Sequence, residues 1–250
     1  MLCTLIKPTS GSILCDGKDI FALDGEYRRI LGYLPQEFGF YPEFSVHDYL
    51  MYIASIKGMR TSIARKRVTE LLRQVGLAKM QNRKMKKLSG GMKRRAGIAQ
   101  AMLNNPKILI LDEPTAGLDP NERIRFRNLI SELSQDRLVL LSTHIVSDIE
   151  YIANQVLLMK DGKISHSGTQ EEIIQSVPVK VWSCVVANNE VEMWQKQFKV
   201  SNMKTLSDGI ELRILSEKSP HYNAKEETMT LEDIFLYYFG EKTGDDYDVL

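Results

Sequence analysis

The amino-acid sequence predicts an α/β protein with a mostly parallel core sheet. Residues 108–111 and 138–141 are continuous apolar runs with the length of buried strands, and a helical pattern over residues 126–133 separates them. Buried strands that alternate with a helix are typical of a parallel sheet. Asp-Gly pairs at residues 16–17 and 161–162 lie between short apolar runs, so they predict antiparallel β hairpins before and after this core.

The composition is that of an ordinary globular protein, and it narrows the possible partners. With 43% hydrophobic and 26% charged side chains, the 250 residues suffice for one large domain or two small ones. The net charge of +1 gives no overall attraction to nucleic acid or anionic lipid. The apolar runs are far shorter than the ~18 residues that span a bilayer, so a membrane role would require a partner. Three widely spaced cysteines, Cys3, Cys15 and Cys184, suit a reducing cytosol rather than a disulfide framework or zinc site.

Residues 1–11, MLCTLIKPTSG, are expected to form the end of a helix followed by a Pro-Thr-Ser-Gly turn. They lack the basic segment and the long apolar stretch of a signal peptide. Because the sequence opens at a helix end, we expect that the chain has lost its beginning.

A strand-rich segment follows, and then a helical insertion over residues 45 to about 105. Residues 12–20 contain the first hairpin, and residues 30–34 form a strand. Ser45 with Asp48 resembles a capping box at the start of the first helix of the insertion.

The second helix of the insertion has Thr61 as its expected N-cap and Gly76 just beyond its end. A third helix is expected from about Met92 to Leu103, where Asn-Asn-Pro stops it. Beyond residue 177 the pattern changes to strands at 179–186 and 210–214 with a helix between them, and to a last helix capped at Thr230. We therefore expect one domain over residues 1–176 and a small αβ appendage over residues 177–250.

The stretch ILILDEP, residues 108–114, carries the clearest chemistry. Ligands bind at the carboxyl ends of the strands in open α/β sheets, and Asp112 with Glu113 follows such a strand directly. Acids at strand ends are also common turn residues, so this feature alone does not establish a site.

Other motifs supply the context. Gln36 follows a strand, LSGGM spans residues 88–92, GLD spans 117–119 and STH spans 142–144. Together and in this order they resemble the ATP-binding-cassette (ABC) family, over roughly residues 1–170, with Met92 where the family usually has Gln. The resemblance implies an ABC cassette of P-loop NTPase-like fold with a helical subdomain at about residues 45–105.

The resemblance also implies roles that suit phosphoryl transfer, in which catalysis is mainly positioning and charge neutralisation. Asp112 would hold Mg²⁺ through water, and Glu113 would be the general base. Gln36 would contact the metal or the attacking water, His144 would hydrogen-bond the γ-phosphate, and Asp119 would lie at a dimer interface. A solvated loop glutamine and an ordinary histidine are the alternatives for Gln36 and His144 when each is taken alone.

Two glycines at the start of the third helix are expected to form a phosphate-binding element, separate from the acidic residues at the end of the strand. Gly90 and Gly91 leave backbone N–H groups open, and the helix dipole favours an anion there. In the family the motif Ser89, Gly90, Gly91 and Met92 serves the ATP held by the opposite subunit, so that each ATP lies between two chains.

Two features could indicate nucleic-acid binding, but we expect no nucleic-acid partner. The basic residues of segment 83–95 have no interleaved aromatic side chains, so they fit a solvated surface better. The aromatic run Phe38, Phe40, Tyr41 and Phe44 is expected to pack at the edge of the helical insertion. The basic residues are Arg83, Lys84, Lys86, Lys87, Lys93, Arg94 and Arg95.

The family's glycine-rich loop, which ends in Gly-Lys-Ser/Thr, has no match within residues 1–250. Either the chain is truncated before this loop, or it is a partner subunit that has lost its own site. We favour truncation, because Glu113, Gln36 and His144 would otherwise have no nucleotide to serve.

The sequence thus predicts the ATP-hydrolysing subunit of an ABC transporter. Its expected partners are transmembrane permease subunits and a second ATP-binding subunit, identical or different, at the cytoplasmic face of the cell membrane. The segment TLEDIFLYYFG, residues 230–240, resembles the tails of bacterial drug- and antibiotic-exporter ATPases and favours export. The alternatives are a catalytically incomplete subunit that contributes only its signature motif, and a non-transport ABC ATPase acting on ribosomes or DNA.

Overall fold

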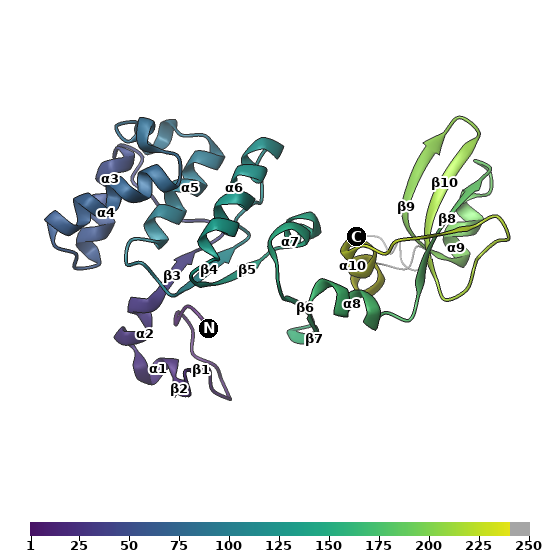
Figure 1. Ribbon diagram of the computed structural model, residues 1–250, viewed down its shortest axis with the longest axis horizontal. Helices are drawn as coiled ribbons and strands as arrows, with labels where there is room; N and C mark the ends of the chain where they lie inside the picture. Colours follow the sequence, from purple (N-terminus) through teal and green to yellow (C-terminus); the bar gives the residue numbers. More distant parts are fainter. Residues whose placement is uncertain (241–250) are drawn as a thin grey trace, which may run out of the picture. The chain divides into compact units, whose positions relative to one another are not determined.

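A computed structural model describes residues 1–240 (Figure 1). The contacts within the chain divide it into two compact units, Met1–Ile145 and Val146–Leu250. This division lies earlier in the chain than the boundary expected at residues 176 and 177. The expected assignment of two domains stays a prediction, and the two units are described separately.

The core of the first unit is the parallel sheet that the sequence predicts. β4 (Ile108–Asp112) lies between β3 (Leu31–Leu34) and β5 (Leu138–Ser142), and both pairings are parallel. α6 (Pro120–Leu133) connects β4 to β5 and buries the four apolar residues that predicted it. Those residues are Phe126, Leu129, Ile130 and Leu133. The predicted α/β class, with parallel core and hairpins, is confirmed.

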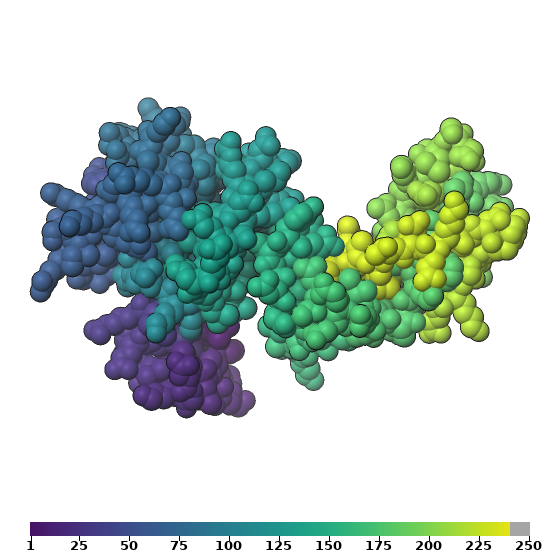
Figure 2. Space-filling model, viewed as in Figure 1, coloured from purple at the N-terminus to yellow at the C-terminus, as the bar shows by residue number. Residues whose placement is uncertain are grey.

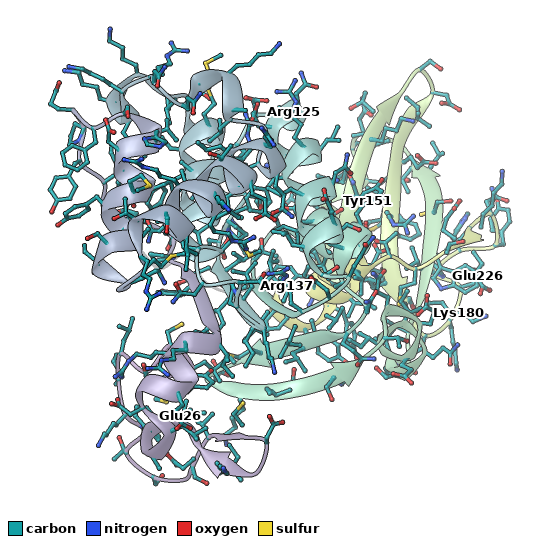
Figure 3. All side chains as sticks on the ribbon, turned by 60° about the vertical axis from the view of Figure 1, so that its left-hand side comes forward. Glu26, Arg125, Arg137, Tyr151, Lys180 and Glu226 are labelled. Carbon is teal, nitrogen blue, oxygen red and sulfur yellow. The ribbon has the colours of Figure 1, made fainter. Side chains whose placement is uncertain are left out.

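The side chain of Arg137, just before β5, makes contacts that the sequence did not indicate. Its guanidinium donates to the backbone oxygens of Leu133, at 2.9 Å, and Pro106, at 3.3 Å (Figure 3). Leu133 ends α6 and Pro106 precedes β4. One nearly buried arginine thereby ties the entry points of two neighbouring strands to the helix between them.

The segment before β3 contains a hairpin and two short helices. β1 (Leu14–Cys15) pairs with β2 (Lys18–Asp19), and both turn residues, Asp16 and Gly17, have positive φ as a two-residue hairpin requires. α1 (Ile20–Leu23) and α2 (Gly25–Ile30) follow, two short helices that the sequence analysis did not predict between the hairpin and the strand. Residues 1–13 form turns and bends, so the expected helix end was wrong. One turn, closed by Thr4 N–H and Met1 O, cannot sustain a helix by itself.

The helical insertion is present in the first unit. α3 (Val46–Ile56) starts at Ser45, whose Oγ accepts the backbone N–H of Asp48 at 3.0 Å. In α4 (Thr61–Gln74) the N-cap is Arg60, so the assignment of the cap to Thr61 was one residue late. Gly76, with φ +67, ends this segment as predicted. The 3-10 turns η1 (Ala78–Met80) and η2 (Met85–Lys87) lead to α5 (Gly90–Ala101).

The second unit begins with α7 (Val146–Ile152), the hairpin of β6 (Val156–Lys160) and β7 (Lys163–Gly168), and α8 (Gln170–Ser176). An antiparallel sheet follows in the order β11-β8-β10-β9. Its strands are β8 (Lys180–Val186), β9 (Lys199–Leu206), β10 (Gly209–Ser216) and β11 (Lys225–Glu227), with α9 (Val191–Gln197) between β8 and β9. Lys180 and Glu226 form an ion pair of 2.8 Å between β8 and β11 (Figure 3).

α10 (Leu231–Phe239) returns to the beginning of this unit (Figure 2). Leu231 and Ile234 share a hydrophobic core with Val156, Ile173 and Val177. The capping box expected at Thr230 is present, with Asp233 as its acidic member. None of the helices in residues 1–240 has the length and apolar character needed to cross a bilayer.

Asp233 also makes a buried ion pair that the sequence did not indicate. Its side chain accepts two hydrogen bonds from Arg213, at 2.9 and 2.8 Å, and one from Ser201 at 2.9 Å. Burial alone would raise the pKa of Asp233, but the bonds from Arg213, Thr230 and Ser201 outweigh it and lower the pKa. The charged carboxylate thus joins α10 to β9 and β10.

Candidate functional site

Two predicted site residues lie at the carboxyl edge of the parallel sheet, beside the end of β5. Asp112 ends β4, and Ser142, which ends β5, donates from Oγ to its Oδ1 at 2.6 Å. The backbone N–H of Glu113 donates to Ser142 O at 3.0 Å. Parallel strands bring their carboxyl ends to one edge, which is why residues thirty positions apart in sequence meet here.

Glu113 is held in an unusual conformation. Its φ is +43, a region that costs a non-glycine residue about 1–3 kcal/mol and that is concentrated at functional sites. One oxygen, Oε1, lies 2.8 Å from Nδ1 of His144 and accepts the His144 backbone N–H at 3.1 Å. The other oxygen, Oε2, is buried without a hydrogen-bond partner among the described residues. An unpartnered buried carboxylate oxygen costs free energy unless a ligand or water satisfies it.

His144 lies on the loop after β5, with its side chain 68% exposed. The sequence assigned this histidine to the γ-phosphate of ATP, whereas the structure shows its contact with Glu113. The contact was not predicted, because no periodicity or spacing relates residues 113 and 144.

Gln36 is exposed on the loop that follows β3, one strand away from Asp112. Within residues 1–240 it makes no hydrogen bond to Asp112 or Glu113. The loop is tied instead to α5, because Arg94 donates to Pro35 O at 3.2 Å. Burial lowers the pKa of Arg94, and the charges of Glu37 and Asp112 partly oppose this shift. The sequence analysis placed Arg94 on a solvated basic surface, but it is half-buried and lies close to the carboxyl edge.

The signature motif, LSGGM at residues 88–92, leads into α5, which begins at Gly90 and ends at Ala101, about two residues earlier at each end than expected. Ser89 is the N-cap, and its Oγ accepts the backbone N–H of Met92 at 3.3 Å. The two glycines differ in their surroundings. A Cβ added to Gly90 would meet nothing within 4 Å, whereas one added to Gly91 would overlap the carboxylate of Glu122 on α6. Only Gly90 therefore leaves open space beside the helix N-terminus.

Asp119 is the N-cap of α6, and its Oδ1 accepts the backbone N–H of Glu122 at 2.9 Å. Gly117, with φ +72, permits the turn that leads from β4 to this cap. The sequence analysis did not predict that Glu122 contacts the signature motif. The position of Glu122, three residues after Asp119, indicates a helix cap but gives no information about α5.

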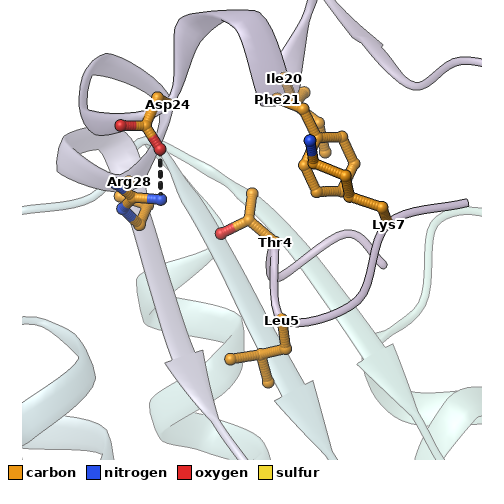
Figure 4. A pocket seen from close by; sticks show the side chains of 7 residues that line it. All are labelled: Thr4, Leu5, Lys7, Ile20, Phe21, Asp24 and Arg28. Atoms are coloured by element: carbon orange, nitrogen blue, oxygen red, sulfur yellow. Dashed lines mark ion pairs between the residues drawn. The ribbon is translucent and has the colours of Figure 1, made fainter.

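The pocket drawn in Figure 4 lies elsewhere in the first unit. It has a volume of about 370 Å³, and the ion pair of Asp24 and Arg28, 2.7 Å apart, forms one wall. None of the motif residues lines it. We therefore place the candidate site at the carboxyl edge of the sheet and not in this pocket. The lining residues are Thr4, Leu5, Lys7, Ile20, Phe21, Asp24 and Arg28.

The site offers few protein ligands for a metal. The described residues contain no group of three or more His, Cys, Asp or Glu side chains placed to hold an ion. Asp112 and Ser142 together supply oxygen ligands of the kind that a hard cation prefers when it keeps several waters.

This fold is that of an α/β protein with its candidate site at the carboxyl edge of a parallel sheet, and the comparisons with known proteins show which family it resembles. The family described as "ABC transporter" matches residues 1–116. An ABC transporter ATP-binding protein of Bacillus subtilis (strain 168), YxlF, is 37% identical over 197 residues, which cover 79% of this chain and 65% of that protein. The bacitracin transport ATP-binding protein BcrA of Bacillus licheniformis is 39% identical over 166 residues, 66% of this chain and 53% of that protein.

A solved structure supports the same relationship. The cbiO1 protein of Clostridium perfringens, described as part of the ABC transporter complex cbiONQ, has a TM-score of 0.63 and 28% identity, covering 70% of this chain and 72% of that one. Residues 1–116 thus match the ABC transporter family, and the chain is similar to ATP-binding proteins of ABC transporters. It spans less than two thirds of the length of the curated relatives that it matches.

Proposed function

We propose that the chain is the ATP-binding and ATP-hydrolysing subunit of an ABC transporter and couples hydrolysis to export across a membrane. The contact of Glu113 with His144, beside Asp112, carries this proposal. It places a carboxylate with one fixed and one unpartnered oxygen at the edge of the sheet where α/β proteins bind their ligands.

In this mechanism Glu113 is the general base. His144 holds Oε1, so Oε2 is left to accept a hydrogen bond, and then the proton, from an attacking water. Asp112, oriented by Ser142, would hold Mg²⁺ through water, and Gln36 would contact that water or metal from the loop after β3. Bound Mg²⁺ would neutralise the charge that develops on the transferred phosphate.

In this proposal the signature turn, residues 89–92 of the signature motif, binds the nucleotide of a second subunit. Ser89, Gly90, Gly91 and Met92 begin a helix whose N-terminus favours an anion, and Gly90 leaves room for one. Asp119 would meet the same opposite subunit, identical or different. The ATP would then lie between the two chains.

The names of two relatives support a role in transport, and the resemblance of residues 230–240 to exporter tails supports its direction. BcrA is named for bacitracin transport, and a relative in Escherichia coli (strain K12), YbhF, is named a probable multidrug ABC transporter ATP-binding protein and is 29% identical over 255 residues, 96% of this chain and 44% of that protein. We propose that permease subunits recruit the chain to the inner face of the cell membrane.

The test supplies the phosphate-binding loop, because residues 1–250 contain no Gly-Lys-Ser/Thr segment. The whole chain is fused behind a strand and a glycine-rich loop ending in Gly-Lys-Ser/Thr, and Mg²⁺-dependent release of phosphate from ATP is measured. The expected result is turnover that Glu113→Gln abolishes and that Glu132→Gln, an exposed change on α6, leaves intact. A well-folded fusion that binds ATP but whose turnover is equally low with and without the Glu113→Gln change would refute the proposal.

A further inference from the structure

The side chain of Glu122, on α6, occupies the space beside the signature turn. A Cβ on Gly91 would lie 2.7 Å from Cγ of Glu122 and closer still to the carboxylate. The Glu122 side chain is only 12% exposed. A side chain at position 91 would therefore displace the Glu122 carboxylate, which approaches Gly91 from another helix.

Arg95, one turn further along α5, is the cation that pairs with this acid. Its Nη2 is 3.3 Å from Oε2 of Glu122, and its side chain is 13% exposed. The same guanidinium donates from Nη1 to the backbone oxygens of Val75, at 3.1 Å, and Gly76, at 3.5 Å. The pair thus joins α6, α5 and the end of α4 through charge-assisted hydrogen bonds.

The backbone of Glu122 holds a second functional segment. Its N–H donates to Oδ1 of Asp119 at 2.9 Å. One residue thereby contacts the signature turn through its side chain and the Asp119 loop through its main chain. Arg125, exposed on the same helix, adds a pairing of 2.8 Å to Oε1 of Glu122 (Figure 3).

We propose that Glu122 is a positioning residue that holds the signature turn and the Asp119 loop in one fixed arrangement. The inference rests on the proposed function, in which both segments meet the ATP of the opposite subunit. A carboxylate beside a helix N-terminus repels a phosphate unless a cation offsets it, and Arg95 supplies that cation. Loss of Glu122 leaves Arg95 without its acid and opens a gap beside Gly91, so the turn loses its support.

The first measurement uses residues 1–250 alone and does not depend on ATP hydrolysis. Amide hydrogen exchange is followed in peptides that cover Ser89–Lys93 for the unmutated chain, Glu122→Ala and Glu122→Gln. The Ala variant is expected to exchange there about tenfold faster, while α3 and α4 are unchanged. Glu132→Ala, an exposed change on the same helix, is the matched control and should exchange like the unmutated chain.

The second measurement separates positioning from general stability. In the fusion that carries a phosphate-binding loop, Glu122→Ala is expected to lower kcat about tenfold and leave KM for ATP within about twofold, because the loop that holds a chain's own ATP is unaltered. Glu122→Gln keeps the volume and removes the charge, so it should keep the exchange protection and still lose about threefold or more in kcat.

The outcomes distinguish the two proposals. An unmutated fusion without ATPase activity would count against the proposed function, and the exchange measurement would still test Glu122. Exchange and kcat of Glu122→Ala equal to those of the unmutated protein would overturn the positioning role. If Glu122→Ala does not fold, an unchanged kcat in Glu122→Gln would overturn the role of the ion pair with Arg95.

Discussion

Nδ1 of His144 lies 2.8 Å from Oε1 of Glu113, and the backbone N–H of His144 donates to the same oxygen. The second oxygen of Glu113 is buried and has no hydrogen-bond partner in the described part of the chain. A carboxylate held at one oxygen and available at the other is suited to orient and deprotonate a water. The backbone of Glu113 is strained, with a positive φ. The strands β4 and β5, which position Glu113 and His144, hold it in that conformation.

Replacement of Glu113 by Gln should leave ATP binding intact and slow turnover by at least ~100-fold, the loss expected for a general base. The change is made in the fusion that supplies a phosphate-binding loop, and single-turnover hydrolysis is measured beside nucleotide affinity. The nucleotide-bound dimer should then accumulate. Turnover close to that of the unmutated fusion would remove Glu113 from this role.

Aspartate at the two signature glycines should have different effects. At Gly90 the new carboxylate enters open space at the N-terminus of α5, so it should block a phosphate there while the fold is kept. At Gly91 it meets the Glu122 carboxylate, so it should also lower the melting temperature. In mixed dimers the Gly90→Asp defect should map to the nucleotide held by the unmutated chain. A defect at the mutant chain's own nucleotide would contradict the shared site.

Residues 1–250 alone should not bind Mg-ATP tightly, because their sequence contains no Gly-Lys-Ser/Thr loop to supply a nest of N–H groups and a lysine for the β- and γ-phosphates. Titration calorimetry on the chain, with the loop-bearing fusion as positive control, measures this directly. β5 is an edge strand of its sheet within residues 1–240, and Leu138 is 63% exposed, so light scattering should also show association. Micromolar affinity for ATP would reveal a phosphate site that the motifs do not indicate.

Asp233→Ala should destabilise the second unit by about 3 kcal/mol, because Arg213 would lose its buried acid. Glu192→Ala removes an exposed pair on α9 and should leave the free energy of unfolding nearly unchanged. Urea unfolding followed by tryptophan fluorescence measures both.

The pH dependence of this pair follows from the sign of the shift. The pKa of Asp233 is lowered in the folded chain, so its contribution is complete above the ordinary aspartate pKa and is lost as the pH falls below that value. The difference in stability between the unmutated chain and Asp233→Ala should therefore shrink on acidification. A difference independent of pH would show that the carboxylate charge is unimportant.

The sequence predicted the parallel strands β4 and β5 because their apolar runs are continuous, and the hairpins because Asp-Gly pairs fit their turns. It missed β9, Lys199–Leu206, whose largely polar residues have no strand pattern and which pairs along its length with β10. The motif residues could be named because their order in the sequence resembles that of the ABC family. The contacts of Glu113 with His144 and of Glu122 with Gly91 could not, since they join separate elements. The catalytic and binding roles of the motif residues stay predictions.

The position of α10 at the end of the second unit has a consequence for protein synthesis. The core beneath the β6–β7 hairpin is completed by Leu231 and Ile234, which are translated only after the entire β8–β11 sheet. At a translation rate of about 5–20 residues per second, the apolar residues around the hairpin stay uncovered for on the order of 3–12 s until α10 has been synthesised. During this interval the nascent chain presents Val156, Ile173 and Val177 to chaperones and to neighbouring nascent chains, so co-translational holding at this stage should govern the yield of folded protein in a cell.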